Sequence, residues 1–120
     1  MWEVEYTDQF EALWEGLTED EQERITSAID VLEQRGPALG RPIVGEVAGS
    51  KLHNLKELRP LGTSIRVLFV FDPRRTAILL VGGDKAEHGW KTWYAGAIAE
   101  AEALYEDHLA TLREEGLLNE

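Results

Sequence analysis

Residues 64–81 read SIRVLFVFDPRRTAILLV and carry the clearest strand pattern in the chain. The odd-numbered positions from 65 to 71 are Ile, Val, Phe and Phe, and this period of two predicts a β-strand. Asp72-Pro73-Arg74-Arg75 predicts a reverse turn, because proline sets φ at its second position. Residues 76–81 are an apolar run typical of a strand inside a sheet. Since a short turn joins neighbouring strands antiparallel, residues 64–81 predict a β-hairpin.

A third strand is expected just before this hairpin. Its two faces carry Leu52, Asn54, Lys56 and Leu58 on one side and His53, Leu55, Glu57 and Arg59 on the other. Pro60-Leu61-Gly62 predicts a turn, so the three strands form an antiparallel meander. Residues 36–50 are rich in glycine and proline and predict a loop, and Gly82-Gly83 predicts a turn at the end of the last strand.

Two helices are expected before the meander, after an N-terminal strand at residues 2–6. The first helix carries apolar residues at helical spacing, namely Phe10, Leu13, Trp14 and Leu17. Thr18 followed by Glu21 is a capping-box pattern that starts the second helix. Arg35-Gly36-Pro37 supplies a cation, a glycine and a proline that end it. The short junction between the two helices predicts a helical hairpin.

A long final helix is expected from Trp90 to Leu112, followed by a polar tail at residues 113–120. One stripe of this helix carries Tyr94, Ile98, Ala101, Tyr105 and His108. The element order is therefore β-α-α-β-β-β-α. It predicts a single α+β domain over residues 1–120, in which the helical hairpin and the C-terminal helix cover one face of a small antiparallel sheet.

The composition excludes several classes of protein. The 120 residues contain no cysteine, which rules out disulfides and thiolate chemistry and fits a cytoplasmic location. The N-terminus lacks the pattern of a signal peptide, and no apolar run approaches the roughly 20 residues that span a bilayer. A net charge of −11 argues against nonspecific binding of duplex DNA, because such binding rests on many phosphate contacts.

Charge is unevenly distributed along the chain. Residues 51–91 hold eight basic and four acidic residues, whereas the rest of the chain holds four basic and 19 acidic ones. A basic segment in so acidic a protein favours a local anion site. Solvated lysines and arginines on strand surfaces are the alternative explanation.

Arg59 and Arg66 are the leading candidates for this anion site. They flank the turn between two antiparallel strands, so their side chains can converge, with Lys56 or Lys85 nearby. Arginine binds phosphate through two parallel hydrogen bonds, and a cation cluster can stabilise the charge of a phosphodiester transition state. The alternative is that Arg59 pairs with Glu57 or with an acidic helix.

Proton transfer and base stacking have weaker candidates. His53 and His88 lie near the basic segment and can move protons at neutral pH, although a lone histidine is more often structural. Trp90 lies before the apolar stripe of the final helix begins, so its ring is expected to be exposed. An exposed indole can stack on a base, and Lys91 lies beside it. The three histidines are widely spaced and no metal motif is present, so neither metal nor cofactor is expected.

The runs Leu55–Arg59 (LKELR), Ile65–Phe69 (IRVLF) and Ile78–Lys85 (ILLVGGDK) together resemble the RelE/ParE toxin superfamily. The resemblance is closest to its HigB-like, phage Gp49-like branch and covers most of the chain. Arg59 corresponds to the arginine of the family's ELR, Arg66 to that of its RVLF strand and Lys85 to the first lysine of its KK pair. Ala86 replaces the second lysine, and residues 87–94 replace the usual basic stretch.

The resemblance implies a RelE-like, microbial RNase-like fold and the toxin role in a type II toxin–antitoxin system. It further implies ribosome-dependent mRNA cleavage without metal, by attack of a ribose 2′-OH, and neutralisation by a cognate antitoxin. Arg59 and Arg66 are expected to hold the phosphate, and Lys56, Lys85 or His53 to assist proton transfer. Trp90, His88 and Lys91 are expected to contact RNA. Two alternatives remain: a non-enzymatic inhibitor of a protein such as gyrase, in the manner of ParE, and an inactive binding module.

Overall fold

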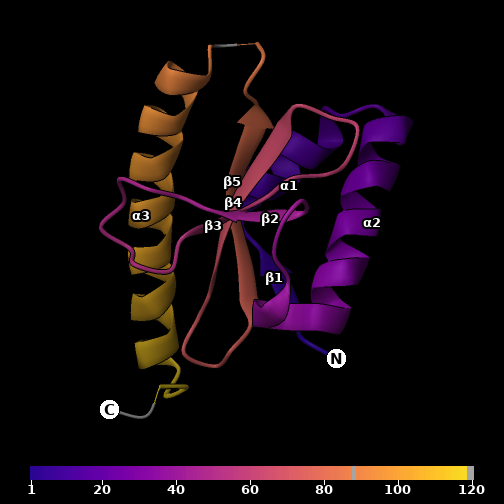
Figure 1. The fold of residues 1–120 in the computed structure, drawn as a ribbon. Coiled ribbons are helices and arrows are strands. Elements are labelled where there is room, and N and C mark those ends of the chain that lie inside the picture. Colours follow the sequence, from indigo (N-terminus) through magenta and orange to yellow (C-terminus); the bar gives the residue numbers. More distant parts are fainter. Residues whose placement is uncertain (88, 119–120) are drawn as a thin grey trace.

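A computed structural model describes residues 1–87 and 89–118 of the chain and contains one five-stranded sheet (Figure 1). The strands lie in the order β1-β5-β4-β3-β2. Their bounds are β1 Val4–Tyr6, β2 Val44–Glu46, β3 Lys56–Leu58, β4 Ile65–Phe71 and β5 Ala77–Asp84. The helices are α1 Asp8–Glu15, α2 Glu19–Arg35, the 3₁₀ turn η1 Gly36–Ala38 and α3 Trp90–Glu114. Within the described residues, none of these helices combines the length and the apolar character needed to cross a membrane.

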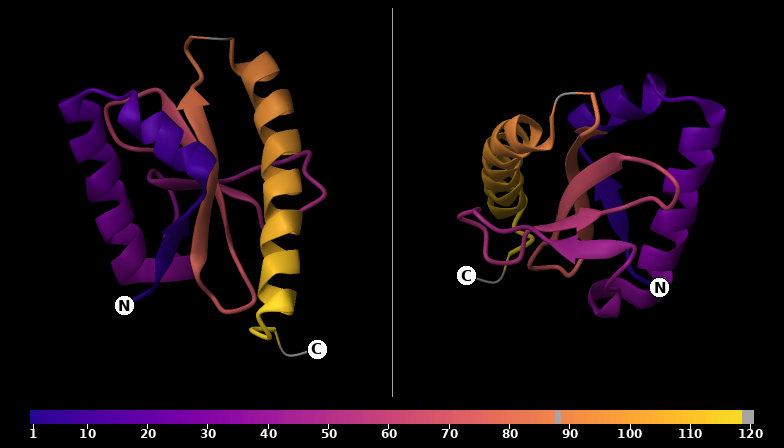
Figure 2. Two further views of the ribbon diagram at one scale, coloured as in Figure 1. Left: turned by 180° about the vertical axis from the view of Figure 1, so that it is seen from behind. Right: turned by 45° about the horizontal axis from the view of Figure 1, so that its top comes forward.

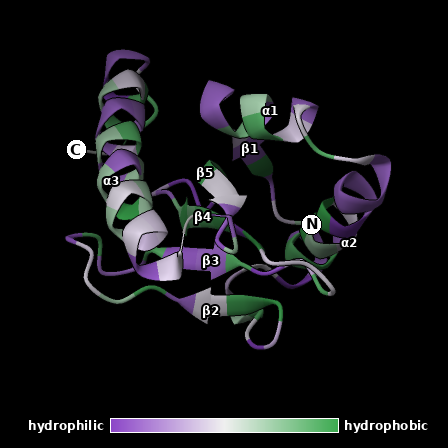
Figure 3. Cartoon of the chain, turned by 90° about the horizontal axis from the view of Figure 1, so that it is seen from above, coloured by the Kyte–Doolittle hydropathy of each residue, from purple (hydrophilic) through white to green (hydrophobic). Residues whose placement is uncertain are grey.

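The helices cover both faces of the sheet. The α1–α2 hairpin packs on one face and α3 on the other, so the sheet lies between two helical layers (Figures 2 and 3). Ile65, Val67 and Phe69 of β4 face the hairpin, whereas Leu68 and Val70 of the same strand face α3. The α+β class with its helical hairpin and C-terminal helix is confirmed. The expectation of helices on one face is wrong, because both faces of β4 are apolar and each needs a cover.

The meander of β3, β4 and β5 is antiparallel as predicted. β1 was not assigned a partner from the sequence, and it pairs in parallel with β5 at the edge of the sheet. The opposite edge is β2, which pairs antiparallel with β3 inside the segment that was expected to be a loop. The third expected strand is correspondingly short: the chain turns at residues 51–54 and becomes extended only from Lys56.

The helical hairpin begins at two threonine caps. The Thr7 side chain accepts a hydrogen bond from the backbone N–H of Phe10 at 3.2 Å and starts α1. At the start of α2 the predicted capping box is present, since Thr18 and Glu21 bond each other's backbone N–H groups. These bonds satisfy N–H groups that have no partner within the first turn of a helix.

β5 continues through Gly82 and Gly83, where the sequence predicted a turn. A Cβ on Gly82 would lie 2.8 Å from Leu13 Cδ2, and one on Gly83 would lie 2.4 Å from Trp93 Nε1. The two glycines thus let α1 and α3 approach opposite faces of the same strand. Glycine is required at these two positions because there is no space for a side chain, and not because the chain turns there.

Candidate active site

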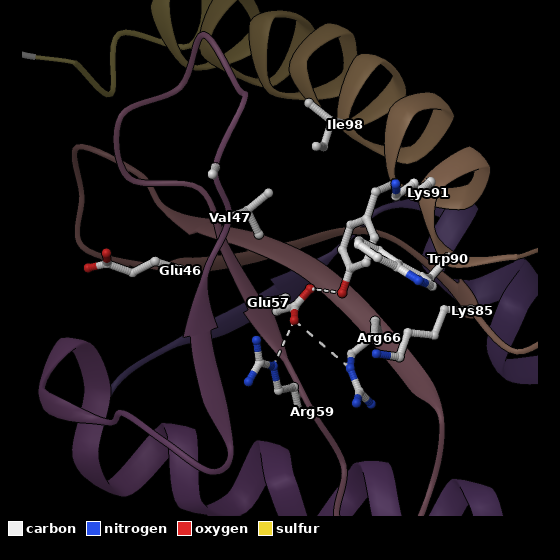
Figure 4. A pocket seen from close by; sticks show the side chains of 11 residues that line it. Glu46, Val47, Glu57, Arg59, Arg66, Lys85, Trp90, Lys91 and Ile98 are labelled. Carbon is white, nitrogen blue, oxygen red and sulfur yellow. Dashed lines mark hydrogen bonds and ion pairs between the residues drawn. The ribbon is translucent and has the colours of Figure 1, made fainter.

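A cleft of about 640 Å³ opens between the sheet and the N-terminal half of α3 (Figure 4). Its polar lining comes from Glu46, Glu57, Arg59, Arg66, Lys85 and Lys91, and its remaining lining from Val47, Ala48, Trp90, Tyr94 and Ile98. The four cations outnumber the two carboxylates, so this cleft is a locally positive site on an acidic protein.

Glu57 lies at the centre of the cleft wall, and its carboxylate contacts the surrounding polar side chains. Only 3% of this residue is exposed. Its Oε1 accepts a hydrogen bond from Arg59 Nε at 2.7 Å, and its Oε2 accepts one from the Tyr94 hydroxyl at 2.5 Å. Arg66 Nε lies 3.9 Å from the same Oε1. A buried carboxylate needs such partners, because an unpaired buried charge is strongly unfavourable.

Arg66 is held at the start of β4 and carries an unsatisfied donor. Its Nη1 donates to the carbonyl of Ile65 at 2.7 Å and to that of Thr63 at 3.3 Å. Its Nε is buried and has no hydrogen-bond partner among the described residues. The side chain is only 16% exposed. Arg66 is therefore a largely desolvated cation fixed by the backbone beside the cleft, where its attraction for an anion is stronger than in water.

A β-bulge brings Lys85 to this face of the sheet. Leu68 is paired with Val81 and Phe69 with Leu79, so Leu80 of β5 is the extra residue. Leu80 and Val81 consequently both face α3, and the alternation beyond them is shifted by one. Lys85 then shares the cleft with Arg66. Without the bulge, strict alternation would send Lys85 to the opposite face of the sheet.

The segment that forms the other wall of the cleft is attached to α3. Glu102 Oε2 accepts hydrogen bonds from the backbone N–H of Lys51 at 2.6 Å and from the hydroxyl of Ser50 at 2.8 Å. These two bonds hold the pKa of the Glu102 carboxyl below its ordinary value. Val47 and Ala48, which precede this attachment, line the cleft together with Ile98 of α3.

Tyr94 remains a hydrogen-bond donor far above neutral pH. Burial and the adjacent Glu57 carboxylate raise its pKa from 10.0 to about 12. A raised pKa of an acid means that the bond to Glu57 stabilises the fold below pH 10 and is lost as pH rises toward 12. The phenol thus links α3 to the carboxylate that holds the arginines.

We expect Tyr94→Phe to remove one phenol that ionises near pH 12. The difference in phenolate absorbance between wild type and variant, recorded by rapid pH jump before unfolding, measures this ionisation directly. A difference curve with its midpoint near 10.0 would contradict both the burial of this phenol and its bond to Glu57.

The structure brings together five of the residues proposed from the sequence. Arg59, Arg66, Lys85, Trp90 and Lys91 all line the cleft. Trp90 is 58% exposed, as expected.

Two other candidates do not reach the cleft. Lys56 lies on the hairpin side of β3, with its Nζ 5.8 Å from the centroid of the Phe71 ring, because alternate residues of a strand face opposite sides. His53 is exposed in the turn before β3 and does not line the cleft. His88 lies outside the described residues.

Sequence reasoning did not propose Glu57 and Tyr94 as site residues. The pairing of Arg59 with Glu57 was considered only as an alternative to a functional arginine. The signal for Glu57 was its position two residues before Arg59, which puts both side chains on one face of the strand. Tyr94 was expected on the stripe of the final helix, but no signal marked its bond to Glu57, because that contact spans 37 residues of sequence.

Comparisons with known proteins agree with this architecture. Residues 12–106 match the family model Phage derived protein Gp49-like (DUF891). The chain is 53% identical over 103 residues to a protein of Mycobacterium tuberculosis (strain ATCC 25618 / H37Rv) provisionally named toxin HigB3, covering 86% of this chain and 90% of that one. It is 46% identical over 98 residues to a protein of the same strain provisionally named toxin HigB2, covering 79% of this chain and 48% of that one. The chain therefore spans about half the length of the second relative.

A solved structure shares the fold. The free E. coli toxin RelE, solved as a double arginine-to-alanine mutant, superposes with a TM-score of 0.60 at 9% identity and covers 82% of this chain and 95% of its own. At this identity the likeness concerns the fold alone.

Proposed function

The chain belongs to the phage-derived Gp49-like family, and from this premise we propose that it is the toxin of a type II toxin–antitoxin pair and cleaves mRNA on the ribosome. The resemblance to the HigB-like branch of the RelE/ParE superfamily is confirmed. The observation that carries the proposed activity is the arrangement of Arg59 and Arg66 around one buried carboxylate, with Lys85 in the same cleft.

The proposed reaction is an internal transfer at one phosphodiester. The ribose 2′-hydroxyl gives its proton to a water molecule as its oxygen bonds to phosphorus, and the bond from phosphorus to the 5′-oxygen breaks, which leaves a 2′,3′-cyclic phosphate and a 5′-hydroxyl. Arg59 and Arg66 bind the non-bridging oxygens and stabilise the charge that develops on them. Of the three residues considered for proton transfer, Lys85 is the one that lines the cleft, so we assign it the proton delivered to the leaving 5′-oxygen.

The aromatic end of the cleft suits an unpaired nucleobase. The exposed ring of Trp90 lies beside Lys91, whose Nζ is 5.8 Å from the ring centroid. A base stacked on an indole is bound through its flat face, which every base has. Single-stranded RNA presents such bases, whereas duplex DNA keeps them stacked inside.

The small number of cations in the cleft supports the proposal that the substrate is mRNA held in position by the ribosome. Four cleft cations offset by two carboxylates bind free RNA weakly, because affinity for nucleic acid grows with the number of phosphates contacted. A ribosome that presents mRNA in a fixed position removes the need for a long basic groove. The proposed action therefore belongs to the bacterial cytoplasm. A cognate antitoxin that binds the chain is part of the same proposal, as the names of the relatives suggest.

We expect mRNA cleavage to require ribosomes and to persist in EDTA, because the cleft supplies fixed cations of its own. The assay uses ribosomes loaded with mRNA and cross-linked before chelation, so that loss of magnesium does not dissolve the complex. Products should carry 5′-hydroxyl ends, detected by direct kinase labelling.

Two results would contradict this assignment. One is cleavage that stops on chelation while the cross-linked ribosomes stay intact. The other is growth arrest on expression with intact mRNA, and in that case DNA damage dependent on gyrase would support the alternative of an inhibitor that binds a protein.

A further inference from the structure

Gly45 occupies a position in β2 where the backbone gives no reason for a glycine. It pairs with Glu57 of β3 within the sheet, and its φ is not among the positive values of this chain. A glycine inside a strand weakens that strand, because it loses more freedom on folding and offers no side chain to pack. The reason for Gly45 therefore lies in the space above it.

That space is filled by the guanidinium of Arg59. A Cβ built on Gly45 would lie 2.5 Å from Arg59 Nη2, 2.7 Å from Cζ and 3.1 Å from Nε. The first two separations are shorter than the contacts that real Cβ atoms make, so the guanidinium occupies the volume that a side chain at position 45 would need. Gly45 is buried beneath it.

Glu57 fixes the same guanidinium from a second direction. The bond from Arg59 Nε to Glu57 Oε1 is 2.7 Å long, and Glu57 is itself held by Tyr94. With Nε bound to Glu57, Nη1 and Nη2 of Arg59 have no hydrogen-bond partner among the described residues, although Arg59 lines the cleft (Figure 4). The two terminal nitrogens thus have a fixed orientation and remain available to donate hydrogen bonds to a ligand.

We propose that Gly45 and Glu57 are positioning residues that form a cradle for Arg59 and aim its terminal nitrogens at the phosphate of bound RNA. The nature of the anion rests on the proposed function. Gly45 does not line the cleft, so its effect on the reaction passes entirely through Arg59. A guanidinium held on two sides has less freedom to lose when it binds a phosphate, and its alignment does not depend on the substrate.

The test is Gly45→Ala, with Gly40→Ala as the matched control. A Cβ on Gly40 meets nothing within 4 Å, and its φ is also not positive. Gly45→Ala should fold, because the atoms it meets are the end of a flexible side chain that can swing aside. Its kcat for mRNA cleavage should fall by about 10²-fold, since a shift of about 1 Å in a catalytic group has that effect. Gly40→Ala should retain wild-type kcat.

A double variant separates positioning from a general structural role. In an Arg59→Ala background, Gly45→Ala should change kcat by less than about twofold, because the group it displaces is already absent. An equal loss with and without Arg59 would overturn the proposal. So would a Gly45→Ala protein that unfolds while the double variant folds, since the glycine would then serve the fold rather than the reaction.

Two measurements without ribosomes keep this test apart from the proposed function. The NMR signal of Arg59 Nε–Hε in the free protein should shift in Gly45→Ala and not in Gly40→Ala. Binding of a short fluorescent single-stranded RNA at low salt should weaken equally in Gly45→Ala, Arg59→Ala and the double variant. An unshifted signal, or wild-type RNA binding by Gly45→Ala, would refute the cradle. Wild-type protein that fails to cleave mRNA while these two results hold would refute the proposed activity alone.

Discussion

Arg66→Ala is expected to lower the rate of ribosome-dependent mRNA cleavage by about 10²–10³-fold, the loss typical of removing one preorganised donor to a developing negative charge. The expectation follows from the position of Arg66, which is largely desolvated and held by two backbone carbonyls at the edge of the cleft. In cells the same change should relieve growth arrest. Arg66→Lys should recover only part of the rate, because a guanidinium can donate to the Thr63 and Ile65 carbonyls with one nitrogen and to an anion with another, which a single ammonium nitrogen cannot reproduce.

The fold should tolerate the loss of Arg66. Glu57 keeps its shorter bonds to Arg59 and Tyr94, so no buried carboxylate is left without a partner. Arg35→Ala is the matched control, since Arg35 is exposed in the last turn of α2 and lies outside the cleft. An Arg66→Ala protein that is folded by circular dichroism and cleaves within threefold of Arg35→Ala would remove Arg66 from the mechanism.

Of the substitutions proposed here, Asp72→Ala is expected to lower the free energy of unfolding most, by about 3 kcal/mol. This loss is in the range found when one partner of a buried ion pair is removed. The Asp72 side chain is fully buried in the turn between β4 and β5. Its Oδ2 lies 2.8 Å from Arg74 Nη2 and 2.9 Å from His108 Nε2 of α3. Its Oδ1 accepts from the backbone N–H groups of Arg74 and Thr76. Removing the carboxylate leaves the backbone N–H of Thr76 without this acceptor and breaks the contact between the turn and His108 of α3, while Arg74 keeps its pair with Glu5.

Urea unfolding of Asp72→Ala measures this loss, with the exposed Asp30→Ala on α2 as the matched control. The chemistry should survive, because Asp72 does not line the cleft. We therefore expect near wild-type cleavage at low temperature together with a lowered melting temperature. A melting temperature equal to that of Asp30→Ala would show that the contacts of Asp72 do not contribute to folding.

The Asp72 carboxylate also makes the stability of the fold depend on pH. Burial tends to raise the pKa of Asp72, but hydrogen bonds from His108 and Arg74 outweigh burial and hold it below the ordinary value of 3.8. A lowered pKa means that the stabilisation is present above pH 3.8 and is lost as pH falls through the lower value of the folded state. The stabilities of wild type and Asp72→Ala should therefore converge only in strong acid.

The local order of the chain could be predicted from the sequence. The alternation in residues 64–71 and the turn at Pro73 were sufficient for the β-hairpin, because a strand's period of two and a proline's fixed φ are properties of neighbouring residues. The capping box of Thr18 and Glu21 is local in the same sense. Arg59 and Arg66 were expected to share one surface because they flank a single turn between paired strands, and both line the cleft.

Other features were decided by contacts between distant segments. The bulge at Leu80 turned Lys85 toward the cleft, and nothing in an apolar run of residues shows which one will be left unpaired. In the sequence, Gly45 cannot be told from the other glycines of the segment expected to be a loop. Only the structure shows that the Arg59 guanidinium fills the space that a side chain at position 45 would need. Glu57 became the centre of the site because Tyr94, from a helix 37 residues away in sequence, completes its bonding. Sequence patterns report the conformation of neighbours, whereas the register of the sheet and the docking of α3 are set by which packing buries both faces of β4.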